Sequence, residues 1–443
     1  LLAETLSAIG LEVESITDPA DRLGAFVVAR VLEARQHPNA DKLRVCRVDT
    51  GKGVVEVVCG APNARAGMIG VFAPTGTLIP GTGMTLEAKP VRGIVSNGML
   101  CSERELELSE NHDGIIELET ALGDKLGRRY VDAMGLDDPV IEVKVTPNRP
   151  DALGVRGIAR DLAAAGRGTL KKEDLGFAEA GTFDCPIEIA LRFPNGEEMA
   201  CPAFAGRLIR GVSNGPSPAW LRQRLRAVGL RPINALVDIT NLVSIDRCRP
   251  LHVYDADKLA GTIHARFGKP GERFMALDNE EYEADGTMTV IADDSGVLGF
   301  GGIMGGASTG CSDKTVNVFI ESAYFDPVRT AATGRRTGIR SDARHRFERG
   351  IDPRSLPLGI DLATKLIVAN CGGSPSRVRM AGTMPAGKTV IAFRPARIEA
   401  LGGIAVKEAE VKRILRTLGF AVEGKGESLQ VTAPSFRPDV HGS

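Results

Sequence analysis

Four short β-rich stretches decide the fold of the first part of the chain: FVVARVLEA (26–34), VVEVVC (54–59), GVFAP (70–74) and GIIEL (114–118). Segments that contain Gly, Pro and Asn, such as HPNAD and IPGTG, separate these stretches. Closely spaced short strands with Gly-rich turns are typical of a small barrel. The sequence therefore predicts a small β-barrel over residues 25–135.

The segments on either side of this barrel read as helix and strand. Leu2, Leu6 and Ile9 share one helical face and a strand-like run follows, while the strand IEVKVT and a helix around GIARDLAAAGR follow the barrel. We expect these flanks to form one discontinuous α+β domain, residues 1–24 and 136–170, into which the barrel is inserted. The polar, Gly-containing stretch 167–180 is typical of a linker.

Two further modules are predicted towards the C-terminus. Residues 185–380 read as a large α+β region. Within residues 388–443, Val411, Ile414 and Leu418 form a helical stripe that two strand-like runs follow, which favours a partial winged-helix-like unit. The predicted fold class is therefore a multidomain α+β protein.

Composition limits the class of protein. A chain of 443 residues exceeds what one core usually organises, and it has no run of about 18 apolar residues that would span a membrane. The eight cysteines occur singly without CxxC spacing, which predicts free thiols in a reducing cytoplasm rather than disulfides or zinc. The net charge of −1 argues against broad, nonspecific nucleic-acid binding.

Several local patterns carry more than one interpretation. Seven arginines against two carboxylates lie between Arg329 and Arg349, which indicates either a phosphate site or a solvated face. VDITNLV reads as a strand-like run with Thr240 and Asn241 at its centre. His252 lies among apolar neighbours, as satisfied core histidines do, and Glu321 ends an apolar run, where pairing with an arginine is an alternative to a binding role.

Four groups of motifs resemble, in order, parts of the β subunit of bacterial phenylalanyl-tRNA synthetases. HPNADKLRVCRVDTG (37–51) and SNGMLCSERELEL (96–108) resemble the tRNA-binding oligonucleotide-fold (OB) module of several synthetases, and TPNRPDALGVRGIARDLAAA (146–165) resembles the segment that follows it. Five further stretches resemble the editing domain of these subunits: RPINALVDITNLV, RPLHVYDADKL, GFGGIMGG, FIESAYFDP and RTGIRSDARHRFERGIDP. FRPARIEALGG and VTAPSFRPDV resemble the DNA-binding-fold (B5-type) module.

This resemblance implies a cytoplasmic ligase subunit that supports attachment of phenylalanine to its tRNA and itself hydrolyses mischarged tyrosyl-tRNA(Phe). The implied partners are an α subunit in an α₂β₂ tetramer, tRNA(Phe), and tyrosine as the editing-site ligand. ATP and Mg²⁺ belong to the intact enzyme, and we expect no cofactor in this chain. Because the family continues into catalytic-like and anticodon-binding domains that are not present here, we expect an N-terminal fragment. An alternative is a non-catalytic scaffold that guides tRNA and assembles with the α subunit.

The resemblance also implies roles for particular residues. It makes His252, Thr240 and Asn241 the catalytic group that places the ester and its attacking water. It assigns Glu321 to the tyrosine hydroxyl, Gly305 to close backbone approach, and Ala343 to keeping the pocket open. The predicted tRNA contacts are Arg335, Arg336, Arg340 and Arg344. Asp439 matches a magnesium position that is incomplete in this chain, where a solvated carboxylate is the alternative.

The need for a second site follows from chemistry. An apolar pocket shaped for phenylalanine discriminates only about 10²-fold against the same ring with one added hydroxyl. A site that hydrogen-bonds the phenol reverses this preference, since an unpaired buried partner costs ~1–3 kcal/mol when the hydroxyl is absent. Because aminoacyl esters are already activated, positioning a water and stabilising the oxyanion can suffice without a strong general base.

Overall fold

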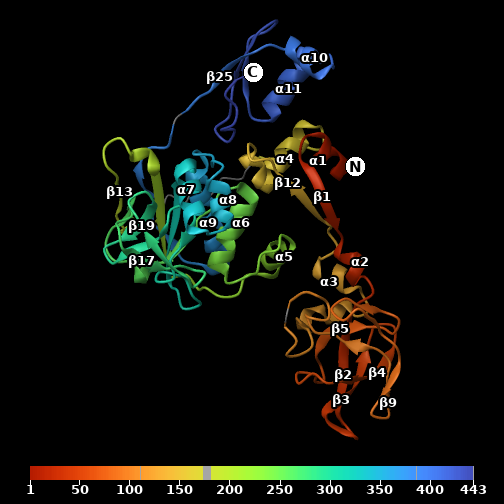
Figure 1. The fold of residues 1–443 in the computed structure, drawn as a ribbon. Helices are drawn as coiled ribbons and strands as arrows, with labels where there is room; N and C mark the ends of the chain where they lie inside the picture. Colours follow the sequence, from red (N-terminus) through yellow and green to blue (C-terminus); the bar gives the residue numbers. More distant parts are fainter. Residues whose placement is uncertain (110, 173–180, 386, 443) are drawn as a thin grey trace. The chain divides into compact units, whose positions relative to one another are not determined.

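The structure, a computed structural model, describes residues 1–109, 111–172, 181–385 and 387–442. Most of the expected linker, residues 173–180, therefore lies outside the described part. Contacts divide the chain into a smaller unit, Glu14–Glu142, and a larger unit formed by Leu1–Val13 and Val143–Ser443 (Figure 1). Within these ranges, every helix is too short or too polar for a membrane span.

The smaller unit is built on a six-stranded sheet of order β10-β5-β2-β3-β4, in which β11 also pairs with β5. Each of the four β-rich stretches forms a strand, as predicted. The strands of this sheet are β2 (Val27–His37), β3 (Ala40–Asp49), β4 (Val54–Cys59), β5 (Ile69–Ala73), β10 (Met99–Leu100) and β11 (Glu117–Leu118). The remaining elements are α2 (Pro19–Leu23), β6 (Leu78–Ile79), β7 (Met84–Thr85), β8 (Lys89–Val91), β9 (Ile94–Ser96) and α3 (Tyr130–Met134).

The sheet of the smaller unit is open, so the closed barrel expected from the sequence is not observed. Among the residues described, no ladder joins β4 to β10. Isolated hydrogen bonds instead join the edge of β4 to the end of β9. Val58 N donates to Ser96 Oγ at 3.0 Å, and Asn97 N donates to Glu56 O at 2.9 Å. A loop therefore covers the edge where a closing strand was expected.

Both faces of this sheet are buried. Successive side chains of a strand point to opposite faces, and Val28 joins one apolar cluster while Ala29 and Val31 join another. The smaller unit therefore has two apolar clusters of its own.

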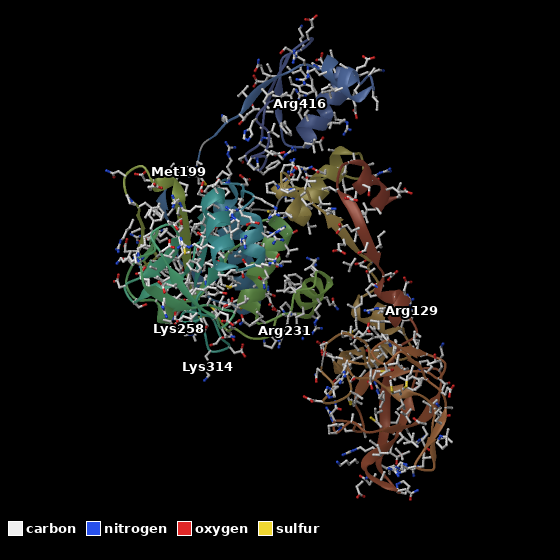
Figure 2. The ribbon with its side chains drawn as sticks, in the orientation of Figure 1. Arg129, Met199, Arg231, Lys258, Lys314 and Arg416 are labelled. Atoms are coloured by element: carbon white, nitrogen blue, oxygen red, sulfur yellow. The ribbon has the colours of Figure 1, made fainter. Side chains whose placement is uncertain are left out.

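The larger unit contains two five-stranded sheets and a helical layer. The first sheet has the order β15-β22-β14-β23, with β24 also on β14, and the second has the order β13-β16-β19-β20-β21. Helices α6 and α9 pack on the first sheet through Leu236, Ile239, Ile360 and their neighbours. Figure 2 shows Arg231, Lys258 and Lys314 at the surface of this unit.

The elements of the larger unit up to residue 382 are α1 (Leu2–Ala8), α4 (Val155–Ala164), β13 (Ile189–Arg192), β14 (Ala203–Arg210), α5 (Ala219–Ala227), α6 (Ala235–Arg247), β15 (His252–Asp255), β16 (Ile263–Phe267), β17 (Glu272–Met275), β18 (Glu281–Ala284), β19 (Thr289–Asp293), β20 (Gly296–Phe300), β21 (Met304–Gly305), β22 (Asn317–Tyr324), α7 (Pro327–Thr337), α8 (Asp342–Phe347), α9 (Ser355–Cys371), β23 (Ser374–Pro375) and β24 (Arg379–Gly382). Strands β1 (Glu12–Thr17) and β12 (Val140–Lys144) pair with each other where the two units meet along the chain. The domain boundaries expected from the sequence stay predictions.

Alternation along β22 determines what each residue faces. Val318 and Ile320 point to the helical layer, while Phe319 and Ala323 join the cluster on the opposite face of the sheet. Because alternate residues share a face, Glu321 points to the same side as Phe319 and Ala323.

The expected strand at VDITNLV is wrong, because these residues lie within helix α6. Asn234 caps this helix by accepting a hydrogen bond from Val237 N at 3.2 Å, as N-cap residues do. Buried Leu236, Ile239 and Val243 recur at intervals of three and four residues, which is the helical period. The composition of a seven-residue apolar run does not by itself distinguish a strand from a helix.

The C-terminal module contains the predicted helix and the two strands that follow it. It comprises β25 (Val390–Phe393), α10 (Ala396–Gly402), α11 (Glu408–Thr417), β26 (Ala421–Glu423) and β27 (Leu429–Thr432), with sheet order β25-β27-β26. Val411 of α11 is buried, and the sheet contributes a small core of Val422, Leu429 and Val431. The winged-helix character of this module stays a prediction.

Candidate functional site

A cavity of about 70 Å³ lies between strands β15, β20, β21 and β22 and helix α8 of the larger unit. Four residues singled out from the sequence line it: His252, Gly305, Glu321 and Ala343. Most of the other lining side chains are apolar, among them Ile291, Phe300, Ile303, Met304, Phe325 and Phe347. Few polar groups in an apolar cavity are typical of ligand sites.

Glu321 is the charged residue of this cavity. It is 7% exposed and lies opposite His252 in the β15–β22 register. Its Oε2 accepts a hydrogen bond from the Tyr254 hydroxyl at 2.5 Å, and its Oε1 has no donor among the residues described. Burial raises the pKa of Glu321 to about 7, although the Tyr254 hydrogen bond and the charge of Arg249 act to lower it.

His252 presents a neutral ring to the cavity. Its Nε2 is buried without a hydrogen-bond partner in the described part of the chain, and its ring packs edge-on against Tyr254 with centroids 4.5 Å apart. Burial lowers the pKa of His252 to about 4. A group with this pKa is a weak proton acceptor at neutral pH, so it is suited to orienting a water rather than to strong general-base chemistry.

Gly305 is required by this packing. A Cβ at this position would lie 2.4 Å from Cε1 and 2.7 Å from Nε2 of His252. The φ of Gly305 is not in the left-handed region, so the constraint is the close approach of the imidazole rather than backbone strain.

Ala343 lies on α8, beside the aromatic wall of the cavity. The helix is capped by Ser341, whose hydroxyl accepts from Arg344 N at 3.1 Å and donates to Ile303 O at 2.6 Å. Phe347 of α8 packs edge-on against Phe325 with centroids 5.2 Å apart. The small side chain of Ala343 therefore lies where a larger one would enter the cavity.

Thr240 and Asn241 lie elsewhere. Both are on α6, and neither is among the described residues that line the cavity. The Thr240 hydroxyl donates to Val237 O at 2.7 Å within its own helix. Their catalytic role, implied by resemblance, stays a prediction.

The arginines predicted to contact tRNA divide into two kinds. Arg335 and Arg340 are exposed and have no ion pair or hydrogen bond with the residues described. Arg336 pairs with Asp285 at 2.7 Å, and Arg344 is bound to Glu348 and to the carbonyls of Gly334 and Ile339. Much of the cluster is therefore internal structure: Arg329 pairs with Glu197, Arg346 with Asp342 and Arg349 with Glu348.

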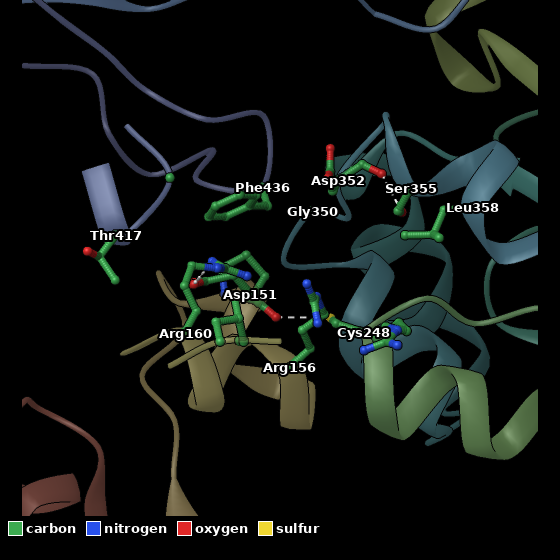
Figure 3. Close-up of a pocket in the computed structure, with 15 residues that line it drawn as sticks. Asp151, Arg156, Arg160, Cys248, Gly350, Asp352, Ser355, Leu358, Thr417 and Phe436 are labelled. Atoms are coloured by element: carbon green, nitrogen blue, oxygen red, sulfur yellow. Dashed lines mark hydrogen bonds and ion pairs between the residues drawn. The ribbon is translucent and has the colours of Figure 1, made fainter. Parts of the chain in front are cut away.

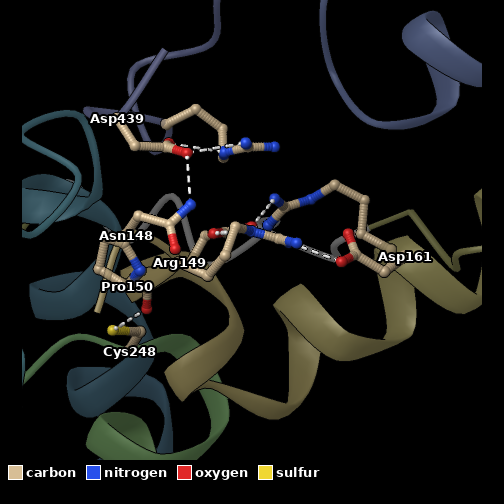
Figure 4. Close-up of polar contacts among 9 residues, drawn as sticks. Asn148, Arg149, Pro150, Asp161, Cys248 and Asp439 are labelled. Carbon is tan, nitrogen blue, oxygen red and sulfur yellow. Dashed lines mark hydrogen bonds and ion pairs between the residues drawn. The ribbon is translucent and has the colours of Figure 1, made fainter. Parts of the chain in front are cut away.

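Asp439 is held by neighbouring donors. Arg437 donates to its two oxygens at 2.8 and 2.9 Å, and Asn148 Nδ2 donates at 3.2 Å (Figure 4). Burial raises the pKa of Asp439, but the Arg437 hydrogen bonds and charge outweigh it and leave the pKa below its usual value. In the described ranges, no three His, Cys, Asp or Glu side chains form a group that could hold a metal.

A second cavity, of about 320 Å³, lies in the larger unit beside α4 and is lined by more charged side chains (Figure 3). Its buried Asp151 is already paired with Arg149 at 3.0 Å and with Arg160 at 3.2 Å, and Arg160 lies over the Phe436 ring. Arg149 also pairs with Asp161 at 2.5 Å. Because both oxygens of Asp151 are already paired with arginines, this cavity is the weaker candidate for a functional site.

The residue that sequence reasoning missed is Tyr254. The available signal was period two: in LHVYD, His252 and Tyr254 are separated by one residue and so share a face of β15. Period two within one strand does not indicate which residues of another strand this face contacts.

Comparison with known proteins places this site in a family. The family "Putative tRNA binding domain" matches residues 26–125, "B3/4 domain" matches 200–372, and "tRNA synthetase B5 domain" matches 391–443. The cavity residues all lie within the B3/4 match. Modules with these descriptions define the class as an aminoacyl-tRNA synthetase chain.

The particular family follows from relatives that match nearly the whole chain. The phenylalanine–tRNA ligase beta subunit of Paramagnetospirillum magneticum is 52% identical over 98% of this chain and 54% of that protein. The corresponding subunit of Rhodospirillum rubrum is 53% identical over 99% of this chain and 55% of that protein. The chain belongs to the family of phenylalanine–tRNA ligase beta subunits, as the motifs predicted, and spans about half the length of the curated relatives it matches.

Among solved structures, an N-terminal fragment of the phenylalanyl-tRNA synthetase beta subunit from Pyrococcus horikoshii is also similar. It is 16% identical, and the match covers 68% of this chain and 82% of that chain with a TM-score of 0.34.

Proposed function

We propose that this chain is an editing subunit, which hydrolyses the ester of tyrosine wrongly attached to tRNA(Phe). The observation that carries the proposal is Glu321: a buried carboxylate in an otherwise largely apolar cavity, with Oε1 free of any described donor. An apolar cavity suits an aromatic ring, and the carboxylate rewards a ring that carries a hydroxyl.

The other lining residues support the same reaction. The orphaned Nε2 of His252 gives the cavity one more polar atom that a water or substrate group can satisfy. Since His252 stays neutral, we assign it to orienting the attacking water. Thr240 and Asn241 contribute only if a conformational change brings α6 towards the cavity.

The cavity must open to admit a ring. Its volume of about 70 Å³ is roughly half that of a ~150 Å³ cavity that holds a benzene ring. Met304 is the flexible side chain in its lining, and methionine adapts readily to a new neighbour. We therefore expect Met304 to change rotamer when an amino acid binds.

At the level of the whole enzyme, we propose that this chain acts beside an α subunit in an α₂β₂ tetramer. The relatives carry the name phenylalanine–tRNA ligase beta subunit, and the ligase reaction uses ATP and Mg²⁺. We assign that chemistry to the partner subunit. We propose that residues 25–135 form an OB-fold module that guides tRNA and that residues 388–443 form a partial winged-helix-like assembly module.

Calorimetric binding of free tyrosine and free phenylalanine tests the proposal. We expect tyrosine to bind more tightly than phenylalanine, and we expect this preference to disappear in Glu321→Ala. Hydrolysis of tyrosyl-tRNA(Phe) should fall with the same substitution. Ala343→Trp should block both binding and hydrolysis by filling the cavity.

Circular dichroism of each variant serves as the control for folding. A folded wild-type chain that binds neither amino acid, or binds both equally, would refute the proposal. The chain would then be a scaffold that guides tRNA without an editing reaction of its own.

A further inference from the structure

Tyr254 shares the editing cavity with Glu321 because of strand register. In the antiparallel pair of β15 and β22, His252 lies opposite Glu321 and Tyr254 lies opposite Phe319. Residues opposite each other, and those two positions along, project from the same face of such a pair. Tyr254 therefore reaches diagonally back to Glu321.

The hydrogen bond from Tyr254 is short and buried. Tyr254 is 2% exposed, and its hydroxyl lies 2.5 Å from Glu321 Oε2. A hydroxyl that donates to an ionised carboxylate makes a stronger bond than that between neutral groups. An ionised carboxylate accepts several hydrogen bonds and donates none, so Oε1 stays available while Oε2 is occupied.

We propose that Tyr254 is a specificity-determining positioning residue, whose hydroxyl occupies Oε2 of Glu321 and thereby presents Oε1 to the hydroxyl of a bound tyrosine. This inference rests on the proposed editing function. The Tyr254 hydroxyl thus holds the Glu321 carboxylate, which accepts the hydrogen bond from the substrate's hydroxyl. The carboxylate therefore keeps one orientation before the substrate binds.

The ionisation of Glu321 is coupled to its hydrogen bond with Tyr254. The titratable and charged groups that surround the carboxyl are His252 and Tyr254 on β15, Arg249 after α6, and Cys201 before β14. Burial raises the pKa of Glu321 to about 7, while the Tyr254 hydrogen bond and Arg249 oppose that rise. Burial and the Glu321 charge hold the pKa of Tyr254 well above its ordinary value, so the proton stays on the phenol.

Loss of the Tyr254 hydroxyl should thus have two effects. The Glu321 carboxyl becomes free to rotate, and its pKa rises further because one stabilising bond to the charged form is gone. A protonated carboxyl presents a donor where the substrate phenol needs an acceptor. Preference for tyrosine should therefore depend on pH and should shift to higher pH in the variant.

The test compares the full chain with Tyr254→Phe and with the control Tyr324→Phe. Tyr324 lies partly buried on β22 and has no hydrogen bond to Glu321. Two quantities are measured between about pH 5.5 and 9: the infrared carboxyl band of Glu321, assigned by its absence in Glu321→Gln, and the ratio of tyrosine to phenylalanine affinity by calorimetry.

We expect the Glu321 midpoint to rise by about one pH unit in Tyr254→Phe and to stay unchanged in Tyr324→Phe. At pH 7 the ionised fraction of Glu321 should fall from about one half to about one tenth, so the tyrosine preference of Tyr254→Phe should fall by about fivefold; the full factor of ten per pKa unit applies only well below the midpoint. An unchanged midpoint and an unchanged preference in Tyr254→Phe would overturn the inference, while wild-type preference for tyrosine would leave the editing proposal standing. A wild-type chain without preference would instead refute the editing function, whatever the Glu321 midpoint does.

Fluorotyrosine at position 254 covers the case in which Tyr254→Phe does not fold. Its more acidic hydroxyl is a stronger donor and should lower the Glu321 midpoint. A midpoint that does not fall would count against the inference.

Discussion

At the scale of single residues, the cavity combines two titratable groups with opposite pKa shifts. Burial raises the pKa of Glu321 to about 7 and lowers that of His252 to about 4. In each case the neutral form is favoured, since a charge loses hydration in the cavity. The site therefore tolerates a charge on Glu321 only through its hydrogen bond and the nearby Arg249.

The first prediction concerns stability and pH. Between the ordinary pKa of 4.5 and the folded pKa of about 7, the folded chain keeps a proton on Glu321 that the unfolded chain releases. The stability that Glu321 contributes is therefore complete below pH 4.5 and is lost as pH rises through 7. Glu321→Gln should be more stable than wild type at pH 8.5 by up to ~3 kcal/mol, at ~1.4 kcal/mol per pKa unit.

At pH 5 this gain should largely vanish. Urea unfolding of both proteins at the two pH values measures the difference, with the transition of the larger unit as readout. Equal stability differences at pH 5 and 8.5 would show that the Glu321 pKa is not raised by burial.

The second prediction concerns Gly305. A methyl group there would lie 2.4 Å from the His252 ring, so Gly305→Ala must displace the imidazole. Such overpacking costs about 1–3 kcal/mol, and we expect tyrosine affinity to fall roughly 10- to 100-fold. Gly286→Ala is the matched control, because no atom lies within 4 Å of its added Cβ. Calorimetry that finds the two variants equal would contradict this packing argument.

The residues of this cavity were only partly predictable. Glu321, His252, Gly305 and Ala343 were named from family motifs, and the structure brings them to one cavity. Tyr254 was not named, because its importance arises from a register between strands that lie more than sixty residues apart. Sequence alone gives period two within a strand but not its alignment with the next.

At the scale of elements, helix α6 was predicted wrongly for the same reason: a local pattern does not show which other elements its residues contact. The run VDITNLV satisfies both strand and helix patterns, and packing of Leu236 and Ile239 against α9 and the first sheet decides for the helix. Helix α11 was predictable because its apolar stripe repeats at three and four residues and Gly419 follows it. The β-rich stretches of the smaller unit were also predictable, whereas the closure of their sheet depends on contacts that no local pattern records.

The third prediction separates two kinds of arginine in the segment from α7 to α8. Arg335 and Arg340 are exposed and have no ion pair with the residues described, so their charge is available to phosphate. Arg335→Gln combined with Arg340→Gln should weaken tRNA binding and lower its salt dependence, with thermal stability unchanged. Binding measured at several salt concentrations gives the slope.

Arg344→Gln is the contrasting variant. It loses bonds to Glu348 and to the carbonyls of Gly334 and Ile339, and unsatisfied buried acceptors cost about 1–3 kcal/mol each. We expect a lower melting temperature for this variant. A double variant that binds tRNA with the wild-type slope would remove Arg335 and Arg340 from the tRNA surface.

At the scale of the whole molecule, the separation into two units has a thermodynamic consequence. Each of the two units has apolar clusters of its own. Single small domains usually unfold in one all-or-none transition, whereas proteins with several domains commonly do not. We therefore expect calorimetry to resolve at least two transitions rather than one.

Two core substitutions assign these transitions. Phe26 is fully buried in the smaller unit and Ile360 in the larger one. Truncating such side chains to alanine costs about 2–5 kcal/mol, so Phe26→Ala should lower one melting temperature by several degrees and leave the other in place. Ile360→Ala should do the reverse, and only Ile360→Ala should weaken tyrosine binding near its transition, because the cavity lies in the larger unit. If both substitutions shift a single shared transition, the two units unfold as one, and the stability of the cavity depends on the smaller unit as well as on the larger one.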